Sequence, residues 1–145
     1  MSSIERHVEG RRLRLEFPPL LELLDGVAQE VRDFLEEHGL AAEAFPLELI
    51  SREAVCNAAI HGSGLSPSRL VRYELDLGDG WASITVEDGG EGWDWKSQCC
   101  SLPSESEEAG RGLFIIQSYS DSVEFNEKGN RICIRKVLTG REESK

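Results

Sequence analysis

Three polar side chains recur at intervals of four residues in the segment EAVCNAAIH, namely Glu53, Asn57 and His61. Side chains with this spacing share one side of an α-helix. The amide oxygen of Asn57 is a suitable ligand for a hard cation such as Mg²⁺. The carboxylate of Glu53 can take a proton from a hydroxyl group or a water that attacks a phosphate. The spacing alone allows two interpretations, a site for phosphate chemistry or a solvated helix face.

A second set of residues opens with an acidic side chain, Asp88, followed by glycines in the run DGGEG. A carboxylate can accept a hydrogen bond from the exocyclic amine of adenine. Gly90 and Gly92 would let the backbone approach a base or a sugar, because no Cβ stands in the way. The alternative is an ordinary glycine-rich turn, since Asp-Gly pairs are common turn formers.

A third set, Gly110, Arg111 and Gly112, opens the apolar segment GRGLFII. Helix N-termini with small residues bind phosphates through backbone amides and the helix dipole. The pattern therefore predicts a phosphate-binding helix start. Arg111 would either contact the same phosphates or point to solvent.

The periodicity of apolar residues predicts the elements that must position these residues. In chain order they are a strand over 11–17, helices over 20–38 and 46–61, strands over 69–77 and 81–87, a helix over 112–119, and strands over 122–126 and 131–137. The stretch 89–110 has little periodicity, so we expect a long functional loop there, with a lid over about 93–110. The order predicts one α+β domain over 1–145, a two-layer sandwich whose mixed sheet is covered by helices on one face.

Charge and composition exclude several classes of protein. The chain has 145 residues, with 27 acidic against 16 basic side chains and a net charge of -11. This balance disfavours direct binding to nucleic acid and favours a basic protein partner. No apolar run reaches the roughly 20 residues that span a bilayer, and the N-terminus is charged where a signal peptide is apolar. We therefore expect a cytoplasmic protein without membrane contact.

The cysteines show no metal-binding or disulfide pattern. Cys56, Cys99, Cys100 and Cys133 include no CxxC spacing, and two of them are adjacent in the chain. Neither a zinc site nor a disulfide framework is expected from such spacing. We interpret all four as reduced thiols.

The ordered set EAVCNAAIHG, DGGEG and GRGLFII resembles the N, G1 and G2 boxes of the GHKL superfamily of ATPases and kinases, which share the Bergerat fold. The resemblance covers residues 47–136. Histidine kinases of this superfamily carry a separate dimerising domain, and its chaperone, topoisomerase and mismatch-repair members are much larger. The chain is thus most similar to the stand-alone anti-sigma factor serine/threonine kinases.

The resemblance implies an α/β sandwich with a largely antiparallel sheet that binds ATP and Mg²⁺. It assigns Glu53 as the general base, Asn57 as the Mg²⁺ ligand and Asp88 as the adenine contact. The further residues that it places around the nucleotide are His61, Gly90, Gly92, Gly110, Arg111 and Gly112.

The family's partners follow from the same resemblance. It implies phosphorylation of a serine or threonine on an anti-anti-sigma (STAS) protein, binding of a sigma factor, and a possible homodimer. A fold of this small size could pair through its sheet edge or its first helix. The predicted lid departs from a phosphate-gripping loop, because Glu105, Glu107 and Glu108 precede the glycines and Lys96 is the one basic residue between the two glycine runs. The alternative is a non-catalytic module of the same fold that sequesters a sigma factor or another regulator.

Overall fold

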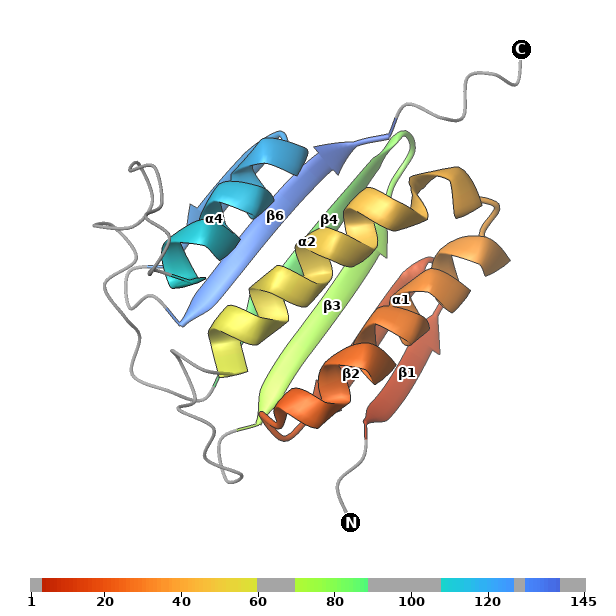
Figure 1. The fold of residues 1–145 in the computed structure, drawn as a ribbon. Helices are drawn as coiled ribbons and strands as arrows, with labels where there is room; N and C mark the ends of the chain where they lie inside the picture. The colour runs from red at the N-terminus through yellow and green to blue at the C-terminus, as the bar shows by residue number, and fades with distance from the viewer. Residues whose placement is uncertain (1–3, 60–69, 89–107, 127–129, 139–145) are drawn as a thin grey trace.

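The computed structural model describes residues 4–59, 70–88, 108–126 and 130–138, and for residues 108–113 it describes the backbone only. These residues form a sheet with a layer of helices on one face (Figure 1). In chain order the elements are β1 (Glu5–Glu9), β2 (Arg12–Phe17), the short 3₁₀ helix η1 (Leu21–Leu23), α1 (Leu24–Glu37), the 3₁₀ helix η2 (Ala41–Glu43), α2 (Ala44–Asn57), β3 (Val71–Leu77), β4 (Trp81–Glu87), α4 (Glu108–Tyr119), β5 (Ser122–Phe125) and β6 (Arg131–Val137).

The sheet has six strands in the order β1-β2-β3-β4-β6-β5, and each neighbouring pair is antiparallel. Helices α1, α2 and α4 lie on one face, with α2 in the middle, and none of the described elements covers the other face (Figure 1). The predicted two-layer α+β sandwich is confirmed. The sheet was predicted to be mixed, whereas every pair of described strands is antiparallel. No helix within the described residues is long and apolar enough to cross a membrane.

The core lies between the sheet and the helices. Alternation along each strand sends one set of side chains inward, as Leu13, Leu15 and Phe17 show on β2, where all three are buried. Helix α1 contributes its buried stripe from the opposite side, including Val31 and Phe34. Each such side chain stabilises the fold by about 1.5–3 kcal/mol through burial.

The C-terminus of α1 is fixed by a glycine in the left-handed conformation. Gly39 has φ +74°. Its N–H donates to the carbonyl of Glu36 at 3.1 Å, and the N–H of Leu40 donates to the carbonyl of Leu35 at 2.8 Å. This pair of bonds is a Schellman motif, which satisfies carbonyls that the helix leaves open. The predicted end of the first helix is thereby confirmed.

The strand β1 is not predicted by the apolar periodicity. All five of its residues are exposed, so the segment ERHVE has no buried side to produce an alternating pattern. Backbone pairing with β2 holds it in the sheet, across a turn in which Gly10 has φ +62°. The predicted element order is otherwise confirmed among the described residues.

Helix α4 begins at Glu108, so the predicted start at Gly112 is wrong by four residues. Alanine is the best helix former, and an acidic side chain in the first turn interacts favourably with the helix dipole, so Glu108 and Ala109 extend the helix backwards. Residues 108–110 of the predicted lid are therefore helical. The rest of the lid, with His61, Gly90 and Gly92, lies outside the described residues.

One buried polar bond fixes α2 on the sheet. The hydroxyl groups of Ser51 on α2 and Tyr73 on β3 lie 2.6 Å apart, and both residues are almost completely buried. Burial raises the pKa of Tyr73 above its ordinary value of 10.0, against the opposite effect of its bond to Ser51. The bond therefore joins two neutral groups. It sets where along β3 the helix lies, because a slip would leave two polar groups unpaired in the core.

We expect Tyr73→Phe and Ser51→Ala each to lower the free energy of unfolding by about 1–3 kcal/mol, because each leaves a buried hydroxyl group without its partner. The double variant should lose less than the sum, because both polar groups are then absent. Urea denaturation measures all three, with Ser118→Ala on the exposed side of α4 as the control. Strictly additive losses would contradict the coupling.

Candidate functional site

Three elements that are separate in the sequence meet at one end of the molecule. Figure 1 shows the last turn of α2, the end of β4 and the first turn of α4 together at this end. Glu53 and Asn57 lie on the last turns of α2, and Asp88 directly follows β4. Gly110 belongs to the first turn of α4. The fold thus brings together residues from all three predicted sets.

The polar pair on α2 stands beside the buried side of the helix. Glu53 and Asn57 are partly exposed, whereas their neighbours Ala54 and Val55 are buried. After Asn57 the helix continues as a π-helical turn at residues 58–59. Turns of this kind are frequent at functional sites, because they shift side chains relative to a regular helix.

The environment of Glu53 makes its carboxylate a better proton acceptor. Partial burial raises the pKa of Glu53 above its ordinary value of 4.5, and the neighbouring guanidinium of Arg52 has a smaller, opposite effect. Arg52 is itself paired across the helix layer with Asp25 at 2.8 Å. A carboxylate with a raised pKa is closer to the value that suits a general base near neutral pH.

Asp88 is buried and its backbone is held from two directions. It is 6% exposed. Its N–H donates to the carbonyl of Asn130 at 3.0 Å, and the side-chain amide of Asn130 donates to the carbonyl of Asp88 at 3.5 Å. The end of β4 therefore places Asp88 in the interior of the protein, with its backbone fixed by Asn130.

Asn126 and Asn130 support this position, and the motifs did not reveal them. The side-chain oxygen of Asn126 accepts the N–H groups of Asn130 at 3.1 Å and Arg131 at 3.2 Å. Its amide donates to the side-chain oxygen of Asn130 at 2.7 Å. In the sequence these residues indicate only a turn between two strands. The contact of Asn130 with Asp88 depends on the pairing of β4 with β6.

The first turn of α4 places backbone amides at the end of the molecule where α2 and β4 finish. N–H groups in the first turn of a helix have no acceptor within the helix. Gly110 lies in this turn, whereas Gly112 lies in the second turn, where amides bond within the helix. The earlier start of α4 therefore moves Gly112 away from the free amides. No three His, Cys, Asp or Glu side chains of the described residues cluster as a metal site.

A family model for a histidine kinase-like ATPase domain matches residues 17–136. This chain belongs to the histidine kinase-like ATPase domain family. The matched range contains every residue of the three motifs. Membership of an ATPase domain family implies ATP as a ligand.

Curated relatives of this family member are named anti-sigma F factor. The one from Clostridium perfringens (strain ATCC 13124) is 33% identical over 93 residues, which cover 59% of this chain and 66% of the relative. The one from Oceanobacillus iheyensis is 32% identical over 104 residues, or 67% and 71% of the two chains. The one from Geobacillus sp. (strain WCH70) is 29% identical over 105 residues, with the same coverage.

The raised pKa of Glu53 predicts a pH-dependent stability. Ionisation of Glu53 is disfavoured in the folded chain, so the free energy of unfolding falls as the pH rises from 4.5 through the raised value. Glu53→Gln removes this loss. The variant should be more stable than the wild type near pH 7, and the difference should vanish at about pH 4.

Urea denaturation at several pH values tests this expectation. Glu22→Gln is the matched control, because Glu22 is an exposed carboxylate on η1. A stability difference for Glu53→Gln that does not grow with pH would contradict the assignment of a partly buried, ionisable Glu53 with a raised pKa.

Proposed function

We propose that this protein is an anti-sigma regulatory factor that binds ATP and Mg²⁺ and phosphorylates a serine or threonine of a STAS-domain partner. The observation that carries the proposal is the meeting of Glu53 and Asn57 on α2 with the buried Asp88 after β4 and the first turn of α4. The family membership and the relatives named anti-sigma F factor support it.

Asp88 is proposed to recognise the adenine base. Its carboxylate can accept a hydrogen bond from the exocyclic amine, and guanine presents an oxygen at that position instead. The backbone of Asp88 is held in place before the base arrives, because its N–H donates to the carbonyl of Asn130 and its own carbonyl accepts the side-chain amide of Asn130. A preorganised acceptor loses little entropy on binding, so it discriminates between bases efficiently.

Asn57 and Glu53 are proposed to act at the phosphates. The donor set fits Mg²⁺, which commonly takes one or two protein oxygens and completes its shell with phosphate oxygens and water. Bound Mg-ATP would supply the transferable phosphoryl group and neutralise its charge. Asn57 would hold the cation through its amide oxygen. Glu53 would accept the proton of the partner's hydroxyl group as the new P–O bond forms.

The remaining site assignments stay proposals. His61, Gly90 and Gly92 lie outside the described residues, and Arg111 is described by its backbone alone. Gly110 is in a position to offer its amide to a phosphate, whereas Gly112 would serve by allowing close approach of the helix.

The partner assignments are proposals on the same basis. A sigma factor and a STAS-domain protein are the expected partners, and pairing with a second copy is also proposed. The net charge of -11 favours basic protein surfaces over nucleic acid. A cytoplasmic location is proposed to match such partners.

A non-catalytic anti-sigma module is the second candidate. The acidic residues Glu105, Glu107 and Glu108 immediately precede the glycines of the third motif. Negative side chains close to a triphosphate would repel it and weaken transfer. In this case the domain would still bind its protein partner, with ATP as a structural ligand or absent.

We expect Asp88→Asn to weaken ATP binding by about 1–3 kcal/mol, or about 5- to 150-fold in Kd, because the adenine amine loses its charged acceptor. Calorimetric titration of the wild type and the variant with ATP and GTP in the presence of Mg²⁺ measures this. Asp79→Asn, in the turn at the other end of β4, is the control. Failure of the wild type to bind ATP at millimolar concentration would reject the nucleotide site.

Replacement of Glu53 and replacement of Asn57 should have different effects on nucleotide affinity and on the rate of phosphate transfer. Asn57→Ala should weaken Mg-ATP binding and abolish transfer together, because the cation loses a ligand. Glu53→Gln should keep nearly normal nucleotide affinity and slow transfer by about 10²- to 10⁴-fold, the usual contribution of a general base. Radiolabelled phosphate transfer to a STAS protein encoded beside this gene, run together with nucleotide titrations, measures both.

The wild-type protein decides between the two candidate functions. Phosphate transfer to the STAS protein would support the kinase. Tight ATP binding and a stable complex with that protein, without detectable transfer, would reject the kinase and support the non-catalytic module.

A further inference from the structure

The strand β1 forms one edge of the sheet, and none of the described strands pairs with its outer side. Figure 1 shows this strand beside α1. An unpaired edge offers a row of backbone N–H and C=O groups to another extended chain. The strand also lies outside residues 17–136, so its edge is not part of the range that the family model matches.

The register shows which backbone groups of β1 point outward. The loop between β1 and β2 has two residues, so Glu9 and Arg12 close the hairpin as a hydrogen-bonded pair. In an antiparallel ladder such pairs alternate with pairs that do not bond to each other. His7 therefore bonds to β2, whereas the N–H and C=O groups of Arg6 and Val8 point away from the sheet.

A bond on the other side of β2 agrees with this register. The N–H of Leu77, at the end of β3, donates to the carbonyl of Arg11 at 2.9 Å. Arg11 thus faces β3, and the next residue, Arg12, faces β1. Arg6 and Val8 therefore present the backbone donors and acceptors with which a further strand would pair.

Helix α1 accompanies this edge along its whole length. Three contacts connect the two elements in chain order: Ile4 lies against Gly26, the guanidinium of Arg6 pairs with Glu30 at 2.7 Å, and the ring of His38 lies 3.2 Å from the carbonyl oxygen of Gly10. The strand and the helix thus run in the same direction. A strand added beside β1 would have α1 on its helix side.

An acidic groove lies between β1 and α1. We call it the edge groove; it has a volume of about 530 Å³ and is lined by Arg6, Glu30, Asp33, Glu36 and Glu37. Four carboxylates are set against one guanidinium, and that guanidinium already pairs with Glu30. The edge groove therefore attracts positive side chains.

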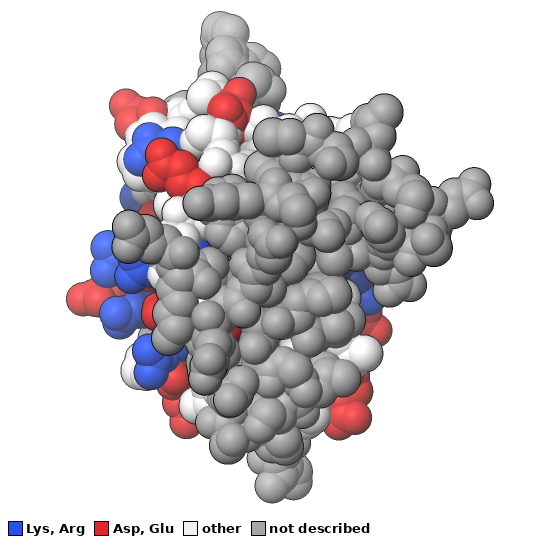
Figure 2. Space-filling view, turned by 90° about the vertical axis from the view of Figure 1, so that its left-hand side faces the viewer, with Lys and Arg blue, Asp and Glu red and all other residues white. Residues whose placement is uncertain are grey.

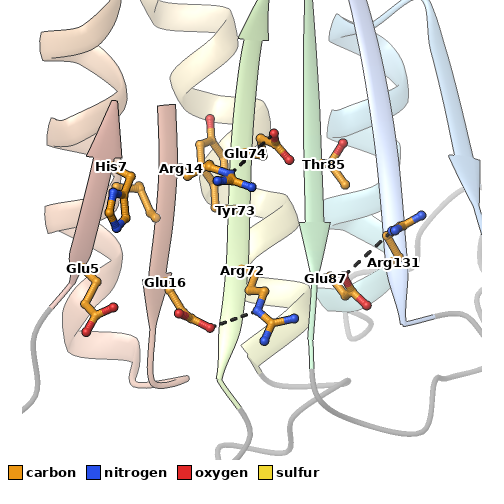
Figure 3. A pocket seen from close by; sticks show the side chains of 11 residues that line it. Glu5, His7, Arg14, Glu16, Arg72, Tyr73, Glu74, Thr85, Glu87 and Arg131 are labelled. Atoms are coloured by element: carbon orange, nitrogen blue, oxygen red, sulfur yellow. Dashed lines mark hydrogen bonds and ion pairs between the residues drawn. The ribbon is translucent and has the colours of Figure 1, made fainter. Parts of the chain in front are cut away.

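The side chains of β1 point alternately to the two faces of the sheet. Figure 3 shows Glu5 and His7 extending on the outer face, opposite the helices, so Arg6 and Val8 lie on the groove side. Val8 is 42% exposed, so it offers an apolar contact beside the carboxylates. The aliphatic stem of a lysine or arginine can pack on such a surface while its charged end stays among the carboxylates.

The outer face of the sheet differs from the edge groove, because its charges are paired within the chain. One row across four strands consists of Glu16, Arg72, Glu87 and Arg131. Arg72 lies 2.9 Å from Glu16, and Arg131 lies 3.9 Å from Glu87. Figure 2 shows basic and acidic side chains mixed along its left-hand margin, which is this face. A balanced surface has little preference for the charge of a partner, whereas the edge groove favours a basic one.

We propose that an extended, basic segment of a partner protein adds to β1 as a further strand of the sheet. Its backbone bonds to the N–H and C=O groups of Arg6 and Val8, and lysine or arginine side chains at its alternate positions enter the edge groove. The same lining disfavours an acidic strand, because like charges would then face each other. The edge thus selects its partner by charge.

Three synthetic peptides with blocked ends test this pairing. The first has about six residues, a typical strand length, and alternates lysine with threonine. The second is the same peptide with a methyl group on the backbone nitrogen of each lysine, so it keeps the charge and loses the donors. The third has glutamate in place of lysine. Calorimetric titration should detect binding of the first peptide alone.

Amide hydrogen exchange, measured by NMR, reports the strand pairing directly. Saturation with the alternating basic peptide should slow exchange of the Arg6 and Val8 amides by about 10-fold or more, because these amides gain an acceptor. The amides of His7 and Glu9 should change little, since they already bond to β2. Attraction by charge alone would not produce this alternation along the strand.

Substitutions in the chain separate the backbone bonds from the charges. Val8→Pro removes an outward N–H and no bond to β2, so it should abolish binding, whereas Val8→Thr keeps the N–H and should bind like the wild type. Asp33→Asn and Glu37→Gln should each weaken binding by about 2- to 5-fold and reduce its salt dependence. Glu124→Gln, on the edge strand β5, is the control and should have no effect.

Slow exchange of the His7 and Glu9 amides verifies that β1 is still paired in Val8→Pro. If this variant loses the pairing, the methylated peptide carries the same test on the wild-type chain. The proposal is overturned if the alternating basic peptide does not bind at millimolar concentration. Equal binding of the methylated peptide, or unchanged exchange of the Arg6 and Val8 amides in the saturated complex, would also overturn it.

This proposal is independent of the proposed function. The strands β2 and β3 separate β1 from β4, the strand that ends at the candidate site. All of these measurements are made without nucleotide. A failure of the peptide to bind would therefore leave the nucleotide site untouched, and a failure to bind ATP would leave the edge of β1 untouched.

Discussion

The close packing of the middle helix α2 against the sheet is the contact on which the candidate site depends. Helix α2 lies between α1 and α4 and carries the polar pair Glu53 and Asn57. Small side chains at Ala54 and Ala58 allow this approach, and both are buried. The bond between Ser51 and Tyr73 then fixes the position of the helix along the strand. Glu53 follows Ser51 by about half a helical turn. The distance between Glu53 and the end of β4 therefore depends on the bond between Ser51 and Tyr73.

The packing of α2 also explains why the candidate site lies at one end of the molecule. The helix runs antiparallel to β3 and to α4, so its last turn reaches the end where β4 finishes and α4 begins (Figure 1). Rigid elements supply Glu53, Asn57 and Asp88, while the segments between them are long. A scaffold of this kind holds catalytic or binding groups at fixed separations and leaves the loops free to vary.

The two faces of the sheet have different physical constraints. The inner face must be apolar, because three helices exclude water from it. The outer face must stay hydrated or be paired, so its alternate positions hold charges that neutralise one another across the strands, as in the pairs of Arg72 with Glu16 and Arg12 with Asp76. Because apolar and charged side chains lie on opposite faces, one antiparallel sheet packs against the core on one side and presents a charged surface on the other.

The sequence by itself determined the element types, most of their bounds and the order of the three motifs, because periodicity and glycine positions are local properties. It also indicated Glu53, Asn57 and Asp88 as a set. It did not reveal β1, whose residues are all exposed, or the early start of α4, where helix propensity outweighed two glycines. Only the tertiary structure placed Asn130 beside Asp88 and aligned the charges of four strands into one row, because both depend on which strands are neighbours.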